Sequence, residues 1–194
     1  MPSGRSWRSW TTESVTADAG LIADAHAVVL PGVGAFGACM DALRACRLDG
    51  VAIDAALDAS AGGRPFLGIC VGMQMLFEGS AESPDHRGLG VVEGRLSLLP
   101  DTVKRPQMQW NRLDIARPSA LFSTVDDPVW VYFVHSYAAD AAGADVVATC
   151  DYGGPVAAAL ERANMWATQF HPEKSGGTGL QMLQAFVTAA QQGV

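Results

Sequence analysis

One short stretch of this chain constrains its fold more than any other, the segment Gly68–Gly72 with Cys70 at its centre. It directly follows the apolar run 65–67, which is typical of a buried strand. A cysteine with a glycine two positions away on either side fits a strained strand-to-helix turn that lifts a nucleophile above a sheet. The positive end of the helix that follows favours a thiolate over a thiol. The stretch therefore predicts a strand–turn–helix unit with Cys70 as a nucleophile.

A second stretch, Gln169–Ser175, supplies the groups that such a nucleophile needs. A reactive thiol works with a nearby base, and His171 is a suitable one. Glu173, two residues further on, offers a carboxylate that can orient the imidazole. We therefore predict a catalytic triad of Cys70, His171 and Glu173.

The composition limits the classes of protein to which this chain can belong. Its 194 residues are enough for one domain with a core of its own, and 49% of them are hydrophobic and only 17% charged. The formal net charge of −7 argues against nucleic acid or an anionic membrane as a partner. The sequence contains no apolar run of 18 residues, and residues 1–10 have no apolar core of a secretory signal.

The four cysteines, at positions 39, 46, 70 and 150, do not have the spacing of a metal site. Cys39 and Cys46 lie seven residues apart in a helical stretch, and Cys150 ends an apolar run. We expect all three to be small buried core residues. Reduced thiols without an export signal predict a cytoplasmic protein. The sequence predicts no cofactor and no metal.

The pattern along the chain predicts an α/β fold, with a mostly parallel, twisted sheet and helices on both faces. Longer strands are expected at 27–30, 65–69 and 165–170, and helices at 38–57, 71–77 and 179–190. The helical stretch 38–57 contains Gly50, so it is either two helices or one broken helix. Shorter alternating strands at 113–115, 130–134, 146–149 and 155–160 indicate an antiparallel or mixed portion in the second half.

The two motifs together resemble those of the class I (triad) glutamine amidotransferases, which have a flavodoxin-like fold. Three further stretches, Pro31–Gly37, Gln109–Asn111 and Tyr132–Tyr137, narrow the resemblance to the glutaminase subunit of imidazole glycerol phosphate synthase. It covers roughly residues 15 to 190. It implies hydrolysis of glutamine to glutamate and ammonia for histidine biosynthesis. It also implies a heterodimer with a separate (β/α)8-barrel cyclase subunit, which receives the ammonia.

The same resemblance assigns further roles to individual residues. The backbone amides of Val33 and Val71 would form the oxyanion hole, and a flip in the turn 31–34 would switch activity. Five residues would hold the substrate glutamine: Gly34, Gln74, Glu82, Ser136 and Tyr137. A solvated Glu82 without a ligand is the alternative for that residue. His135 is expected to be a structural core residue.

The resemblance places the contact with the cyclase at Trp110, Tyr132 and Lys174. Family members usually have a histidine and a glycine where this chain has Gln107 and Gln109. We expect this departure to affect the partner surface and to leave the triad unchanged.

Residues 1–14 do not match the strand, turn and helix with which family members begin. We therefore divide the chain into an atypical, irregular segment 1–14 and an amidotransferase domain 15–194 whose first strand–helix unit is missing. Such a chain should be less stable than one that starts with the family's strand. Two other functions stay open: a glutaminase subunit of another pathway, such as vitamin B6 synthesis, and a catalytically impaired interaction subunit.

Overall fold

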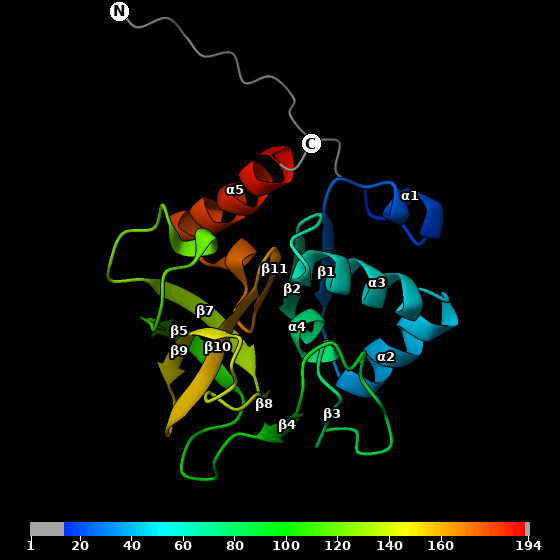
Figure 1. The fold of residues 1–194 in the computed structure, drawn as a ribbon. Coiled ribbons are helices and arrows are strands. Elements are labelled where there is room, and N and C mark those ends of the chain that lie inside the picture. The colour runs from blue at the N-terminus through cyan, green and yellow to red at the C-terminus, as the bar shows by residue number, and fades with distance from the viewer. Residues whose placement is uncertain (1–13, 193–194) are drawn as a thin grey trace, which may run out of the picture.

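The computed structural model describes residues 14–192, and a six-stranded sheet runs through the centre of the molecule (Figure 1). The expectation of an irregular segment 1–14 falls almost entirely outside the described residues. The strands of the sheet, in spatial order, are β1 (Val28–Gly32), β2 (Phe66–Cys70), β11 (Met165–Thr168), β10 (Pro155–Arg162), β9 (Val146–Asp151) and β6 (Asp114–Ile115).

The sheet changes character halfway across. The pairs β1–β2 and β2–β11 are parallel, whereas β11–β10, β10–β9 and β9–β6 are antiparallel. The predicted α/β fold with an antiparallel portion in the second half is thereby confirmed, but the sheet is mixed and not mostly parallel, because three of its five strand pairs are antiparallel. Within residues 14–192, no strand pairs with the outer edge of β1.

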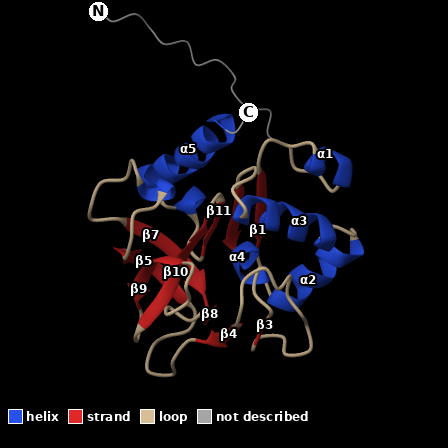
Figure 2. Ribbon diagram, in the orientation of Figure 1, coloured by secondary structure: helices blue, strands red, loops and turns tan. Residues whose placement is uncertain are grey.

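Helices lie on both sides of the sheet (Figure 2). They are α1 (Ala19–Ala23), α2 (Phe36–Ala45), α3 (Asp49–Ser60), α4 (Val71–Met75) and α5 (Gly176–Gln192). The stretch predicted at 38–57 is two helices, and the break is at Arg47, whose φ is 58°, while Gly50 lies inside α3. The last helix begins three residues before the predicted start at 179.

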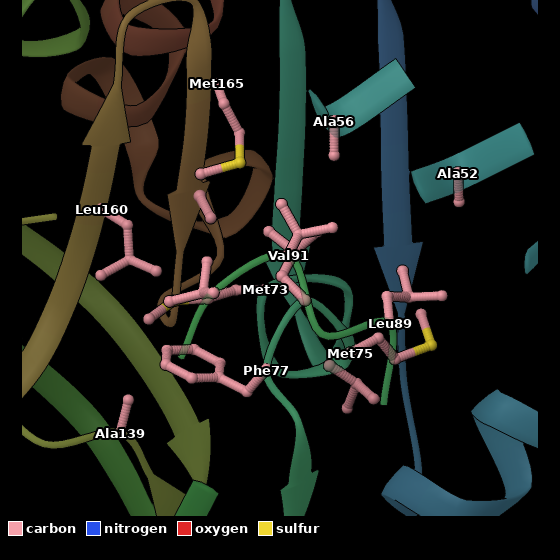
Figure 3. Close-up of a cluster of buried hydrophobic side chains, with 14 of the residues drawn as sticks. Ala52, Ala56, Met73, Met75, Phe77, Leu89, Val91, Ala139, Leu160 and Met165 are labelled. Carbon is pink, nitrogen blue, oxygen red and sulfur yellow. The ribbon is translucent and has the colours of Figure 1, made fainter. Parts of the chain in front are cut away.

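Each face of the sheet has its own core, because neighbouring residues on a strand point to opposite faces. Phe66 of β2 packs with α2, α3 and α4, and the next residue, Leu67, packs in a second cluster with Met182 and Phe186 of α5. Figure 3 shows part of the first cluster, where Met73 lies among side chains from several elements. This two-sided burial explains why the central strands read as continuous apolar runs.

The remaining elements form small extensions of the sheet. A ribbon pairs β5 (Gln107–Arg112) with β7 (Trp130–His135), and a three-stranded piece joins β3 (Gly79–Ser80), β4 (Arg95–Leu98) and β8 (Tyr137–Ala138). Short 3-10 turns are η1 (Ala120–Phe122) and η2 (Pro172–Lys174). We had not predicted β5, although Met108 and Trp110 alternate with polar residues at 107, 109 and 111 in the period of a strand.

The cysteines outside the predicted active site differ in burial. Cys150 is buried as expected, and Cys39 is half-buried against the first core cluster. The prediction for Cys46 is wrong, because this side chain is exposed. Cys46 is the residue that caps the C-terminal end of α2, so it has passed the last turn that packs on the core. None of the helices between residues 14 and 192 is long and apolar enough to cross a membrane.

Candidate active site

Cys70 ends β2 and immediately precedes α4, in a backbone conformation that few non-glycine residues adopt. Its φ is 55° and its ψ is −112°. The predicted glycines are required by space, because a Cβ on Gly72 would overlap the carbonyl of Leu30 and one on Gly68 would lie 3.1 Å from the Gly72 oxygen. This geometry is the strained turn expected from the sequence.

The sulfur of Cys70 is only slightly accessible, since the residue is 4% exposed. Burial raises the pKa of the Cys70 thiol to about 11, and a hydrogen bond with the backbone of Val71 opposes this rise. The Nε2 atom of Gln169 also lies 3.9 Å from Cys70 Sγ. The free thiol is therefore protonated at neutral pH, and forming a thiolate requires a base and hydrogen-bond donors.

His171 and Glu173 form the pair that the sequence predicted. The Nδ1 atom of His171 lies 2.6 Å from Oε1 of Glu173, and the imidazole is buried while the carboxylate is 47% exposed on its side chain. A carboxylate only accepts, so the proton of a neutral imidazole sits on Nδ1 and Nε2 is free to act as a base.

The main chain of His171 is fixed to β7. Its N–H donates to the Tyr132 carbonyl at 3.0 Å, and its own carbonyl accepts from Ser175 Oγ at 2.6 Å. Ser175 Oγ in turn accepts from the Tyr132 N–H at 3.0 Å. These three bonds tie the turn η2, and with it the imidazole, to the strand beside it.

A cavity of about 350 Å³ brings these residues together with most of the predicted substrate site. Cys70 and His171 both line it, and Glu173 stands outside it, behind the imidazole. The other predicted site residues that line the cavity are Val33, Gly34, Val71, Gln74, Glu82, Ser136 and Tyr137.

Gln74 is held more firmly than a surface ligand would be. Its Nε2 donates to the Tyr137 carbonyl and to Oε1 of Gln169, both at 3.0 Å. The residue is only 4% exposed. Its amide nitrogen is therefore committed within the protein, and its carbonyl oxygen is the atom left for a ligand.

Glu82 is half-buried and is anchored at the start of α2. Its Oε2 accepts from the N–H of Phe36 at 2.7 Å, and Ser83 Oγ accepts from the N–H of Gly37 at 3.2 Å. These two side chains replace an ordinary N-cap, because Ala35 at the N-cap position has no side-chain oxygen to accept from the first N–H groups of α2. The alternative of a purely solvated Glu82 is thus wrong, because one oxygen serves a helix end and the residue also lines the cavity.

The turn Pro31–Gly34 includes the last two residues of β1 and leads toward α2, and its Val33 and Gly34 line the cavity. Gly34 has φ of 95°, which an L side chain rarely adopts, and a Cβ on Gly32 would lie 2.8 Å from the Gly72 nitrogen. The thiol of Cys39 donates to the carbonyl of Val33 at 3.2 Å. The turn is thus pressed against the segment that contains Cys70.

The residues predicted to contact a partner lie on the ribbon β5–β7 and beside it. Trp110 and Tyr132 are direct partners across the ribbon, with ring centroids 6.2 Å apart in an edge-on arrangement. Lys174 is exposed in η2. Met108 and Trp130 are 61% and 47% exposed on the same ribbon. Alternation along the two strands puts these four ribbon side chains on one face.

The expectation for Gln107 is wrong, because this residue does not belong to any partner surface. It is fully buried, with Oε1 3.0 Å from His135 Nε2 and Nε2 3.7 Å from Cys150 Sγ. Gln109 is exposed, as expected. His135 is a buried core residue as predicted, and burial lowers its pKa to about 4.

No role was predicted for Gln169, although this residue lies in the stretch that contains His171 and Glu173. It is fully buried and lies between Gln74 and Cys70. A polar residue at the end of an apolar strand, just before a predicted base, was the available signal. Within residues 14–192, no three histidine, cysteine or acidic side chains are grouped to hold a metal ion.

Comparison with known proteins gives consistent matches over most of the chain. A family model described as "Glutamine amidotransferase class-I" matches residues 7–190. The imidazole glycerol phosphate synthase subunit HisH of Lactiplantibacillus plantarum is 49% identical over 175 residues, which are 89% of this chain and 81% of that protein. The subunit of the same name from Rhodopirellula baltica is 46% identical, over 94% of this chain and 88% of that protein.

Solved structures agree on the fold. The glutaminase domain of Trypanosoma brucei CTPS with bound acivicin superposes with a TM-score of 0.62 at 16% sequence identity. The match covers 90% of this chain and 74% of that domain. At this identity the likeness supports the α/β architecture alone.

Proposed function

The chain belongs to the class I glutamine amidotransferases and, within them, to the HisH subunits of imidazole glycerol phosphate synthase, and from this premise we propose how its own residues perform the glutaminase reaction. Its function is to hydrolyse glutamine for histidine biosynthesis. The relatives carry the name of the histidine-pathway enzyme, so the alternative of vitamin B6 synthesis has no support.

In the proposed mechanism Cys70 attacks the side-chain amide carbon of glutamine. A carbon–sulfur bond forms as the thiol proton passes to Nε2 of His171, which returns it to the departing ammonia when the carbon–nitrogen bond breaks. Water, deprotonated by the same imidazole, then hydrolyses the thioester to glutamate and restores the thiol. Glu173 keeps the proton on Nδ1 and stabilises the imidazolium. The observation that carries this proposal is the shared cavity of Cys70 and His171.

The tetrahedral intermediate carries a negative oxygen, for which we propose two backbone donors. The N–H of Val71 is already beside the sulfur. The N–H of Val33 is the second, and it depends on the orientation of the turn 31–34. Losing one such donor lowers the rate by roughly 10² to 10³, so a flip of this turn is large enough to switch the enzyme.

We propose that the walls of the cavity hold the amino-acid end of glutamine. Oε1 of Glu82 is available to accept from the α-ammonium of glutamine, while Oε2 keeps its hydrogen bond with the Phe36 N–H at the start of α2. The carbonyl oxygen of Gln74 and the backbone at Gly34, Ser136 and Tyr137 complete the site. A glutamine that binds Glu82 also touches the residue that fixes the start of α2, next to the oxyanion turn.

As a subunit of a synthase the chain works with a cyclase, and we propose that this partner is a (β/α)8 barrel that forms a heterodimer with it. The contact surface would be the face with Trp110, Tyr132 and Lys174, extended by Met108 and Trp130. Exposed aromatic and methionine side chains gathered on one ribbon are typical of interface centres. We also propose a cytoplasmic location, which four free cysteines support.

The test is glutamine hydrolysis by the purified chain, alone and with the cyclase subunit and its nucleotide ligand. The chain alone should be slow, and the complex should be faster by about 10² to 10³, the value of one oxyanion donor. Full activity without a partner would contradict the switch. Activation by an unrelated synthase in place of the cyclase would contradict the proposed partner.

A further inference from the structure

A chain of side-chain hydrogen bonds leads from a backbone carbonyl to the sulfur of Cys70. Gln74 Nε2 lies 3.0 Å from the Tyr137 carbonyl and 3.0 Å from Oε1 of Gln169. Gln169 Nε2 lies 3.9 Å from Cys70 Sγ. Gln169 is fully buried and Gln74 nearly so, which makes an unpaired polar atom unfavourable at every link.

The Tyr137 carbonyl, at one end of this series of hydrogen bonds, fixes which way both glutamine side-chain amides point. A carbonyl only accepts, so Gln74 must turn its amide nitrogen toward Tyr137. The second hydrogen of that nitrogen is donated to Gln169, which must therefore present its oxygen to Gln74. The nitrogen of Gln169 is then left facing Cys70. Reversing Gln74 would set two acceptors against each other, and reversing Gln169 would set two donors against each other, in both cases in a buried place.

We propose that Gln169 is a positioning residue for the nucleophile: its amide N–H, oriented through Gln74 by the Tyr137 carbonyl, is aimed at Cys70 Sγ and stabilises the thiolate. This inference rests on the proposed role of Cys70 as the nucleophile. It adds a side-chain donor to the backbone donor of Val71, on a sulfur whose burial works against ionisation. A hydrogen bond to the charged form of a group favours that form.

The protein contains a second buried glutamine–cysteine pair, in which the same carbonyl acts through an imidazole and not through an amide. Gln107 lies 3.7 Å from Cys150 Sγ and 3.0 Å from His135 Nε2, and His135 Nδ1 lies 3.0 Å from the same Tyr137 carbonyl. Because the carbonyl only accepts, neutral His135 has its proton on Nδ1 and its Nε2 is an acceptor. His135 therefore requires the N–H of Gln107 for itself, and the Tyr137 carbonyl does not direct that N–H at Cys150. Cys150 also does not line the cavity. The pair is therefore a matched control for the site of Cys70.

The test is the pH dependence of Cys70 alkylation by iodoacetamide, read on the Cys70 peptide by mass spectrometry in the full chain. Gln169→Met removes the N–H at similar volume, and we expect the midpoint of the profile to rise by about one pH unit, a tenfold loss of thiolate below it. Gln107→Met should leave the profile of Cys70 unchanged. An unchanged profile in Gln169→Met, or an equal rise in Gln107→Met, would overturn the inference.

A second variant keeps the test decisive if Gln169→Met does not fold. Gln169→Glu retains the shape and places a carboxyl group beside the sulfur, so ionisation of the carboxyl precedes that of the thiol and Cys70 should again react only at higher pH. A profile in Gln169→Glu that matches that of the unaltered chain would equally overturn the inference. Alkylation needs neither glutamine nor a partner, so a wrong substrate or partner in the proposed function would not affect this result.

A kinetic measurement separates positioning from general damage. With the cyclase complex, Gln169→Met should lower kcat by about tenfold with KM for glutamine little changed, because the lost bond acts on the sulfur and not on the bound amino acid. A rise in KM at constant kcat would assign Gln169 to substrate binding and overturn the inference.

Discussion

Cys70 and Cys150 are two buried thiols with similar acidity and very different surroundings. Each is at most 4% exposed, and burial raises the pKa of each to about 11. Each also has a buried glutamine nitrogen within 4 Å of its sulfur. Cys150, however, lies inside the antiparallel half of the sheet, whereas Cys70 ends a parallel strand at the wall of a cavity.

The comparison shows that neither burial nor acidity in the resting protein distinguishes a nucleophile here. The differences are the strained turn at Cys70, its helix end and the cavity it shares with His171. Parallel strands end in turns that lead to helices, so the parallel half of the sheet supplies these features. The antiparallel half supplies a rigid core.

The two thiols should differ most in how much their removal lowers the rate of glutamine hydrolysis. Cys70→Ala should lower glutamine hydrolysis by the cyclase complex by at least 10⁴, because nothing else at that turn can form the thioester. Cys150→Ala should change the rate less than threefold and act only on stability. Comparable losses in the two variants would break the distinction between the sites.

A glycine-to-alanine substitution should destabilise the protein more in the turn at Cys70 than in an ordinary helix. Gly72→Ala places a methyl group against the Leu30 carbonyl, and we expect it to lower the free energy of unfolding by about 3 kcal/mol. Gly50→Ala, in α3 with open space around its Cβ position, should raise it by up to about 1 kcal/mol. Denaturant unfolding measures both, and equal effects would show that the turn is not tightly packed.

On the Cys150 side, a smaller effect should appear in the dependence of stability on pH. Burial lowers the pKa of His135 to about 4, below the usual 6.5. Between these two pH values His135 is therefore protonated in the unfolded chain and neutral in the folded one. Stability is therefore complete above pH 6.5 and falls as the pH drops toward 4, by about 2 kcal/mol for His135 at pH 5.

The matched variants isolate this contribution. His135→Gln should remove about 2 kcal/mol of the difference in unfolding free energy between pH 7 and pH 5, and His26→Gln, at an exposed position, should retain it. If both variants keep the full pH dependence, His135 is not the group responsible.

The features of the fold and the site that could be predicted from sequence are those determined by residues close together in the chain. Gly68 and Gly72 indicated the turn because a Cβ at either position meets backbone, and the apolar runs indicated the central strands because they are buried on both faces. For 38–57 the sequence left two helices and one broken helix open, and the structure has two helices with the break at Arg47 and not at Gly50.

The parts that were not predictable depend on contacts between distant residues. Gln107 is buried because its neighbours across the fold are His135 and Cys150, and nothing near position 107 in the sequence indicates them. Gln169 is likewise defined by Gln74 and Cys70, 95 and 99 residues away. Cys46 was misplaced because helical spacing does not show where a helix ends.

The most direct test of the central claim is labelling of the full chain, in the cyclase complex, with a chloroketone analogue of glutamine. Mass spectrometry then reports on all four cysteines in one experiment. We expect one label, on Cys70, which excess glutamine prevents, while Cys150 beside Gln107 stays unmodified. A label on Cys39, Cys46 or Cys150 in place of Cys70 would contradict it.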